Sequence, residues 1–350
     1  MNLKDLTLEI CSLMSISGHE STNTEKLFGL VGEHFDECKT DAVGNHFLIK
    51  RSAKKDAPTV LIDTHYDEIG MYVTDIRDGG FLGICSVGGL DPAIMQASEV
   101  TIYGKEIISG VIASTPPHLK SADDEKKLKK IDELIVDTGY SKEEISEIVR
   151  VGTPVGFAPV YRELGKDTGR IAGKSFDDKA CAAAAIYALC NTPREKLAAN
   201  VCLLLSCHEE TVHIGGVAPA AFAEKPDYAM VIDVNFARVP NTPNYETIVM
   251  GEGISVAMSS VTDRKLTNLV LELCTEKEIG HTRCAAPMAT GTNSMALNLV
   301  GEGIPVVDIG LPLKNMHTYT EVIDMKDSQA LARLVEEFVS SEKIAEVYSK

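Results

Sequence analysis

Histidine and carboxylate side chains follow several short apolar runs of this sequence. Hydrolytic metal sites need one or two imidazoles, several carboxylates and a coordination position that stays open for water. A bridging carboxylate can hold two ions about 3.5–4 Å apart. The sequence therefore predicts a site for two divalent metal ions, with five ligands: His65, Asp177, Glu210, Asp233 and His317.

Two further acidic residues stand beside these ligands, and we predict that both are catalytic. Glu209 precedes Glu210 but is not one of the five predicted ligands. It is therefore expected to be the general base for a metal-coordinated water. Asp67 lies two residues after His65, and such residues share a face of an extended segment. We expect the Asp67 carboxylate to hydrogen-bond the free ring nitrogen of His65.

Each of these residues has an ordinary structural role as its alternative. A single histidine after a strand is usually structural, and adjacent glutamates are usually a solvated pair or a helix cap. The pair Asp177-Asp178 is most often an N-cap, and Asp233 alone could cap a strand end. The metal interpretation depends on their joint placement at the ends of predicted strands, where we expect no compensating basic partners.

The elements that must position these residues alternate between strand and helix patterns. Residues 180–190 predict a buried helix, and a 3–4 residue periodicity near the C-terminus predicts an amphipathic helix capped by Asp327 or Ser328. This alternation predicts an α/β fold with a mainly parallel sheet and helices on both faces. Ligands of such sheets bind outside the carboxyl ends of the strands. Four runs are predicted as buried strands: 58–63, 200–206, 228–233 and 304–309.

Residues 71–164 differ from the rest, since β-branched residues there are interrupted by many turn signals. We predict a small β-rich domain, with strands at 71–76 and 99–103 and a helical excursion near 122–149. It is inserted into a catalytic α/β domain of residues 1–70 and 165–350. The insertion holds none of the proposed ligands, so it is expected to be an assembly domain that forms a dimer.

Composition narrows the class of protein. The 350 residues carry 34 basic and 51 acidic side chains, and the basic run at 126–130 directly follows acidic residues, so no nucleic-acid partner is expected. The longest apolar run has 11 residues, which is too short to span a membrane. Nine cysteines without CxxC spacing favour reduced thiols, and with no signal peptide the cytoplasm is the expected location.

Short motifs along the whole chain resemble those of the glutamyl aminopeptidase family. This family includes the tetrahedral (TET) aminopeptidases and proteins once labelled endoglucanases. Residues 65–70 (HYDEIG) are similar to its H-x-D-E-I-G, and residues 176–180 (FDDKA) resemble its D-D-R-A-G. The match also includes residues 17–20 (SGHE) and 41–45 (DAVGN), and the double Glu, Asp233 and His317 complete the set.

The resemblance implies a role for each site residue. His65 and Asp233 would hold one metal, Glu210 and His317 the other, with Asp177 as the bridge and Glu209 as the base. It also implies zinc or cobalt ions, removal of N-terminal residues from peptides, and assembly into dimers and dodecamers. The sequence departs from the family pattern at five positions, which puts substrate preference in question: Cys181, Val212, Ile214, Asn293 and Lys314.

Other functions remain open at this point. A related dinuclear-metal deacylase or dipeptidase would use the same ions on another substrate end. A non-catalytic metal-binding scaffold would have no use for Glu209, and a glycosidase would need paired carboxylates without a metal.

Overall fold

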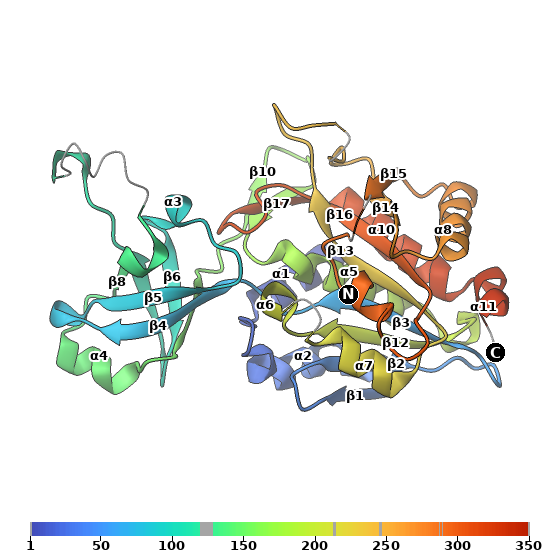
Figure 1. Cartoon of the computed structure of the whole chain (residues 1–350), viewed down its shortest axis with the longest axis horizontal. Helices are drawn as coiled ribbons and strands as arrows, with labels where there is room; N and C mark the ends of the chain where they lie inside the picture. The colour runs from blue at the N-terminus through green and yellow to red at the C-terminus, as the bar shows by residue number, and fades with distance from the viewer. Residues whose placement is uncertain are drawn as a thin grey trace.

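A mixed eight-stranded sheet forms the centre of the larger of two lobes (Figure 1). The computed structural model describes residues 2–119, 129–212, 215–244, 247–286, 288 and 290–348. Parallel pairing joins β12, β3, β13 and β16 in the middle of the sheet, and β14 also pairs with β15 in parallel. The strands lie in the order β1 (Glu37–Thr40), β2 (His46–Lys50), β12 (Asn200–Ser206), β3 (Thr59–His65), β13 (Tyr228–Phe236), β16 (Val306–Leu313), β14 (Ile254–Ser259) and β15 (His281–Ala286).

Helices cover both faces of this sheet, because neighbouring residues of a buried strand point to opposite sides. Val60 and Ile62 of β3 pack in the larger apolar cluster, and Leu61 packs in the second cluster on the other face. The predicted α/β fold is confirmed. The larger cluster takes in α1 (Leu3–Ser12), α2 (Thr24–Val31), α5 (Phe176–Asn191), α8 (Arg264–Glu276), α10 (Met325–Val339) and α11 (Glu342–Tyr348), and the second cluster α7 (Val217–Glu224) and α9 (Ser294–Leu297).

The smaller lobe is a closed barrel with a core of its own (Figure 1). Its strands and two helices fall between Gly70 and Phe157. Beyond it, β10 (Arg162–Leu164) pairs with β11 (Arg170–Gly173), which pairs with β17 (Glu321–Asp324). The barrel comprises β4 (Gly70–Ile76), β5 (Leu82–Val87), β8 (Ile135–Asp137), β7 (Ile107–Ile112), β6 (Glu99–Tyr103) and β9 (Pro154–Phe157), with α3 (Pro92–Met95) and α4 (Lys142–Ile148) beside it.

Most predicted elements are found close to their expected bounds, but the cap of one helix is wrong, and the helical excursion near 122–149 is wrong in part, because the described residues there form strand β8 as well as α4. The buried helix extends over Phe176–Asn191, and the strand at 200–206 is β12. The cap of α10 is Asp324, whose carboxylate accepts from the Lys326 N–H at 3.0 Å, and not Asp327 or Ser328. Most of the basic run at 126–130, and part of the predicted helical excursion, lie outside the described residues.

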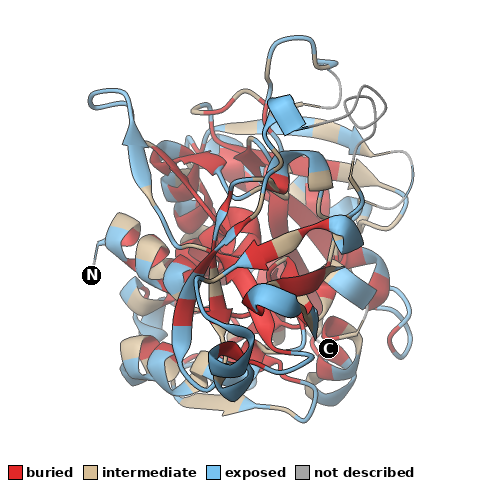
Figure 2. Cartoon of the chain, turned by 90° about the vertical axis from the view of Figure 1, so that its left-hand side faces the viewer, coloured by how far each residue is buried: buried red, intermediate tan, exposed pale blue. Residues whose placement is uncertain are grey.

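Burial follows these two cores. Figure 2 shows buried ribbon concentrated in the central sheet and the helices against it, with exposed residues in the peripheral loops and on outer helix faces. Among the described residues, no helix is both long and apolar enough to cross a membrane.

Candidate metal centre

The five predicted ligands come from five different segments that meet at one edge of the sheet. His65 is the last residue of β3, and Asp233 lies on the adjacent strand β13. Glu210 belongs to α6 (Glu209–Val212), which directly follows β12. Asp177 is in the first turn of α5, and His317 lies in the connection between β16 and β17. The carboxyl ends of the central parallel strands therefore form the site, as open α/β sheets do.

Asp177 occupies the middle of the group, and its two oxygens face two different histidines. Its Oδ1 lies 3.0 Å from His65 Nε2, and its Oδ2 lies 3.4 Å from His317 Nε2. Each histidine faces one more carboxylate: His65 Nε2 is 3.7 Å from Asp233 Oδ1, and His317 Nε2 is 3.2 Å from Glu210 Oε2. The group is thus two imidazole–carboxylate pairs that share one central carboxylate.

The close packing of these groups shifts their pKa values in opposite directions. Burial opposes charge on His65, but its bond to Asp177 and the charge of Asp233 raise the pKa of His65 well above its usual value. Bonds to Asp177 and Glu210 raise the pKa of His317 to about 11. Burial favours a neutral Asp177, but the two histidines lower its pKa to about 2. Protons on the histidines therefore balance the central carboxylate in the metal-free chain.

The carboxylates themselves are short of hydrogen-bond donors. Glu210 Oε1 is buried without a partner among the described residues, and burial together with the Asp177 charge raises the pKa of Glu210 to about 7. Burial and the nearby Asp178 raise the pKa of Asp233 well above its usual value. In the ion pairs of the described residues, no Lys or Arg contacts any of the predicted ligands. Buried acidic oxygens without cationic partners fit divalent metal ions.

Asp67 contributes to the site differently from its prediction. The free nitrogen of His65, Nδ1, lies 3.0 Å from the backbone carbonyl of Asp67, whereas the nearer carboxylate oxygen is 3.7 Å away. The Asp67 carboxylate instead accepts from the backbone N–H groups of Glu209 at 3.0 Å and Glu210 at 3.1 Å. The turn after β3 leaves the carbonyl nearer the ring, so Asp67 fixes both His65 and the start of α6.

Glu321 was not singled out from the sequence. Its carboxylate accepts from backbone N–H groups at Asp177 and His317, as the Asp67 carboxylate does at Glu209 and Glu210. One oxygen of the buried Glu321 carboxylate accepts from the N–H groups of Phe176 at 2.7 Å and Asp177 at 3.2 Å, and the other from His317 N–H at 3.2 Å. Glu321 therefore ties the central ligand to His317. The only hint in the sequence is its place four residues after His317.

Asp178 is a second residue that sequence reasoning left out. It is fully buried, and neither of its oxygens has a hydrogen-bond partner among the described residues. Its ligand atom lies within 4.8 Å of those of His65 and Asp233. Burial raises the pKa of Asp178 well above its usual value. Neither Asp178 oxygen accepts from a backbone N–H group of the described residues, so the Asp178 side chain does not cap α5.

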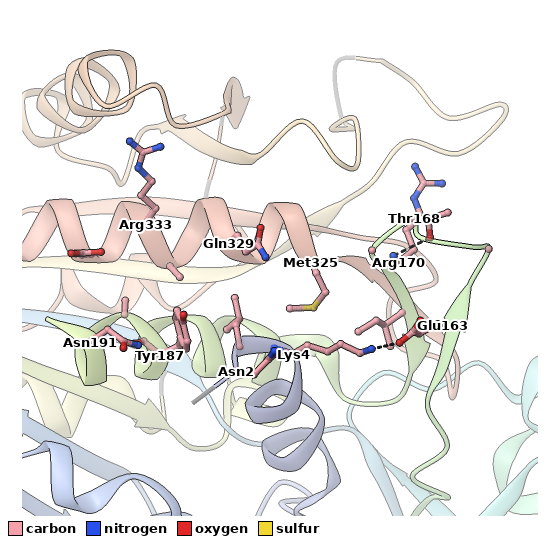
Figure 3. Close-up of a pocket in the computed structure, with 17 residues that line it drawn as sticks. Asn2, Lys4, Glu163, Thr168, Arg170, Tyr187, Asn191, Met325, Gln329 and Arg333 are labelled. Carbon is pink, nitrogen blue, oxygen red and sulfur yellow. Dashed lines mark hydrogen bonds and ion pairs between the residues drawn. The ribbon is translucent and has the colours of Figure 1, made fainter.

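Glu209 and the ligands open onto a cavity of about 910 Å³. Glu209 is 7% exposed, and the cavity extends from the ligands to Phe236, Arg283 and Asp308. A cavity of this size can hold a small peptide end beside the metals. A second cavity, of about 840 Å³, lies between α1, α5 and α10 (Figure 3). Lys4, Tyr187 and Arg333 line it, and it contains none of the predicted site residues.

Five positions depart from the family pattern, and none of them is a predicted ligand. Asn293 is buried and donates from its amide to Asp63 Oδ2 at 2.9 Å and Ser206 Oγ at 3.0 Å. Cys181 is buried in α5, and Val212 is 58% exposed. Lys314 forms a bridge with Val322 of β17, and Ile214 lies outside the described residues.

Comparison with known proteins places this arrangement in a family. A sequence model described as M42 glutamyl aminopeptidase matches residues 44–334. The lysyl aminopeptidase of Pyrococcus furiosus is 29% identical over 333 residues, which cover 92% of each chain.

Solved structures show the same fold over nearly the whole chain. The aminopeptidase APDkam598 from Desulfurococcus kamchatkensis superposes with a TM-score of 0.89 at 26% identity, covering 99% of this chain and 98% of that one. The TET1 peptidase of Pyrococcus horikoshii, described as assembling into a tetrahedron or a large octahedral shell, gives a TM-score of 0.84 at 25% identity, with 97% and 99% covered.

Proposed function

The chain belongs to the M42 glutamyl aminopeptidase family and is a metal-dependent aminopeptidase, and from that premise we propose a role for each residue of its site. His65 and Asp233 would hold one divalent ion, Glu210 and His317 would hold the other, and Asp177 would be shared by both. The observation that carries this proposal is the central carboxylate, whose Oδ1 faces His65 and whose Oδ2 faces His317. Zinc or cobalt suits such nitrogen and oxygen ligands.

When bound, the two ions would polarise the scissile carbonyl and make a water nucleophilic near neutral pH. Glu209 then removes the proton from the attacking water through its carboxylate and returns it to the leaving amine nitrogen. The Asp67 carboxylate holds the backbone of Glu209 and Glu210, so the base and a ligand keep a fixed relation. Asp67 is therefore a positioning residue.

We propose that short peptides with a free N-terminus are the substrates. The cavity at the ligands is large enough for a terminal residue, and the match to the aminopeptidase family supports a free N-terminus as the end that enters it. The test compares a short peptide with its N-acetylated form, with and without a chelator, and then with zinc or cobalt restored. Cleavage of only the free peptide, lost on chelation and recovered with metal, is expected. C-terminal trimming of the acetylated peptide would favour the deacylase or dipeptidase function instead.

Self-association through the barrel is the second part of the proposal. Strand β7 alternates buried and exposed residues, and its outer face presents Ile107, 69% exposed, and Val111, 44% exposed. Apolar residues on an outer barrel face need cover, and a symmetric copy supplies it. The tetrahedron and octahedral shell described for the TET1 peptidase support self-association, and we propose a dimer that builds a dodecamer.

The test of assembly is the mass in solution of the double variant Ile107→Asp/Val111→Asp. We expect a lower mass with metal content unchanged, whereas Phe222→Asp, at a similarly exposed residue of α7, should leave the mass as it was. An unchanged mass in the β7 variant would place the contacts elsewhere. The nine free cysteines support a reducing compartment, and we propose the cytoplasm.

A further inference from the structure

A second group of metal-binding side chains lies beside the segment that carries the base. Glu20, Cys207 and His208 each offer one ligand atom, and these atoms all lie within 4.8 Å of one another. Cys207 Sγ is 3.6 Å from His208 Nδ1, and His208 Nε2 is 3.7 Å from Glu20 Oε1. The group shares no residue with the catalytic ligands.

The three side chains form a chemically mixed set that suits zinc. Thiolate, imidazole and carboxylate are its usual ligands, and tetrahedral geometry with ordinary Zn–S and Zn–N lengths separates sulfur and nitrogen by about 3.6 Å. The observed distance from Cys207 Sγ to His208 Nδ1 matches that value. Three protein ligands leave a fourth position for water.

The surroundings leave both room and access for an ion. Cys207 is 1% exposed and Glu20 is 2% exposed, but the His208 side chain is 29% exposed and opens the group to solvent. Gly44, at a positive φ of 110°, borders the group: a Cβ there would lie 3.6 Å from Glu20 Oε2 and 3.8 Å from Cys207 Cβ.

Present hydrogen bonds do not use up the ligand atoms. Glu20 Oε1 accepts from the N–H groups of Gly18 at 3.0 Å and His208 at 3.3 Å, which leaves the second carboxylate oxygen, Oε2, to face an ion. The Cys207 thiol donates to the Val43 carbonyl at 3.2 Å, a weak bond that a metal–sulfur bond can replace. The structural role of these bonds is therefore compatible with a metal site.

We propose that Glu20, Cys207 and His208 bind a zinc ion at a third site, separate from the catalytic pair. On binding, the Cys207 thiol releases its proton to solvent, and the sulfur and the neutral imidazole each donate an electron pair to the ion. The bound ion would hold the peptide between His208 and Glu209 and so restrain the base.

Cobalt gives a direct readout of this site. The catalytic ligands contain no sulfur, so a thiolate-to-cobalt charge-transfer absorption band can come only from a cysteine site. We expect the full-length protein to take up a third cobalt or zinc ion per chain after the catalytic pair is filled, with this band appearing at the third equivalent. Cys207→Ala should abolish the band and the third equivalent while the first two ions remain.

Matched variants separate the site from other thiols and from misfolding. Cys202→Ala, at a cysteine 2% exposed on β12, should keep the third ion. Glu20→Gln retains an oxygen to accept from Gly18 and His208 but removes the charge, so it should keep the fold and weaken the third ion at least about tenfold. Saturation at the catalytic pair without a charge-transfer band, or a band that survives Cys207→Ala, would overturn the proposal without touching the catalytic assignment.

Discussion

The two halves of the metal centre are built in different ways. His65 and Asp233 stand on adjacent central strands, where β3 and β13 pair in parallel and both side chains are almost fully buried. Glu210 and His317 stand on a one-turn helix and a connection, and the His317 side chain is 36% exposed. The sheet itself fixes the positions of His65 and Asp233. The positions of Glu210 and His317 depend on backbone N–H groups that donate to two buried carboxylates.

Those two carboxylates explain how a loop can place a ligand as well as a strand does. Asp67 binds the N–H groups that open α6, and Glu321 binds those of Asp177 and His317. His317 has a positive φ of 59°, a conformation that a non-glycine residue adopts at some energetic cost. Its bond to Glu321 helps to hold that conformation, so the second half should be the more easily disturbed.

The largest expected effect removes the chemistry and leaves both halves in place. Glu209→Gln should lower kcat by about 10²–10⁴, because it removes the general base, while both ions stay bound. Elemental analysis of the variant beside steady-state rates makes the check. A rate near that of the parent at saturating metal would show that the base lies elsewhere.

Loss of a ligand should affect one half at a time. Glu210→Gln and Asp233→Asn are each expected to retain one ion and lose the other. Burial and the nearby Asp178 raise the pKa of Asp233, so a charge there is unfavourable in the metal-free chain and an uncharged amide should be tolerated. Asp233→Asn should therefore leave the metal-free melting temperature nearly unchanged. A large drop in that temperature would mean that Asp233 supports the fold as well as the metal.

The asymmetry itself is tested at Glu321. Glu321→Gln places an amide where a carboxylate accepts three N–H groups, so we expect about 10–100-fold weaker binding of the ion at His317 and Glu210. The ion at His65 and Asp233 should change less. Isothermal titration of the metal-free protein resolves the two sites, and equal weakening of both would show that the halves are not built differently.

Asp327 provides the matched control for Glu321. It is also fully buried and accepts from two backbone N–H groups, those of Gly251 and Gly253, each at 2.7 Å. Asp327→Asn should cost a comparable loss of folding stability, with metal affinities unchanged. A control that also loses metal would reduce Glu321 to a general stabiliser of the fold.

The sequence predicted the strand-borne half for a physical reason. A strand followed at once by His65, or containing Asp233, places a ligand at the sheet edge through local patterns alone. The role of Glu321 depends on N–H groups 144 and 145 residues away, and the switch of Asp67 from side chain to carbonyl depends on the turn after β3. Such contacts belong to tertiary structure, so a single sequence has no pattern for them. Asp178 was also missed, because an aspartate at the start of a predicted helix is usually assigned to an N-cap.

A change of pH tests the metal affinity of both halves without altering a residue. In the metal-free chain the pKa of His317 is raised to about 11, so its imidazole is protonated at neutral pH and must lose that proton to bind an ion. Because the pKa of His317 is raised from 6.5 to about 11, its protonation stabilises the metal-free fold fully below pH 6.5. This stabilisation is lost as the pH rises towards 11. The apparent metal affinity rises over the same pH interval.

We expect about a tenfold tighter apparent affinity for each pH unit between 6 and 8 for each proton displaced. Calorimetry in buffers of different ionisation enthalpy counts the protons directly. His65, whose pKa is also raised, should release one too, so both halves should respond to pH although only one responds to Glu321→Gln. Binding without proton release would mean that the histidines and the carboxylates of the site are all already deprotonated in the metal-free chain.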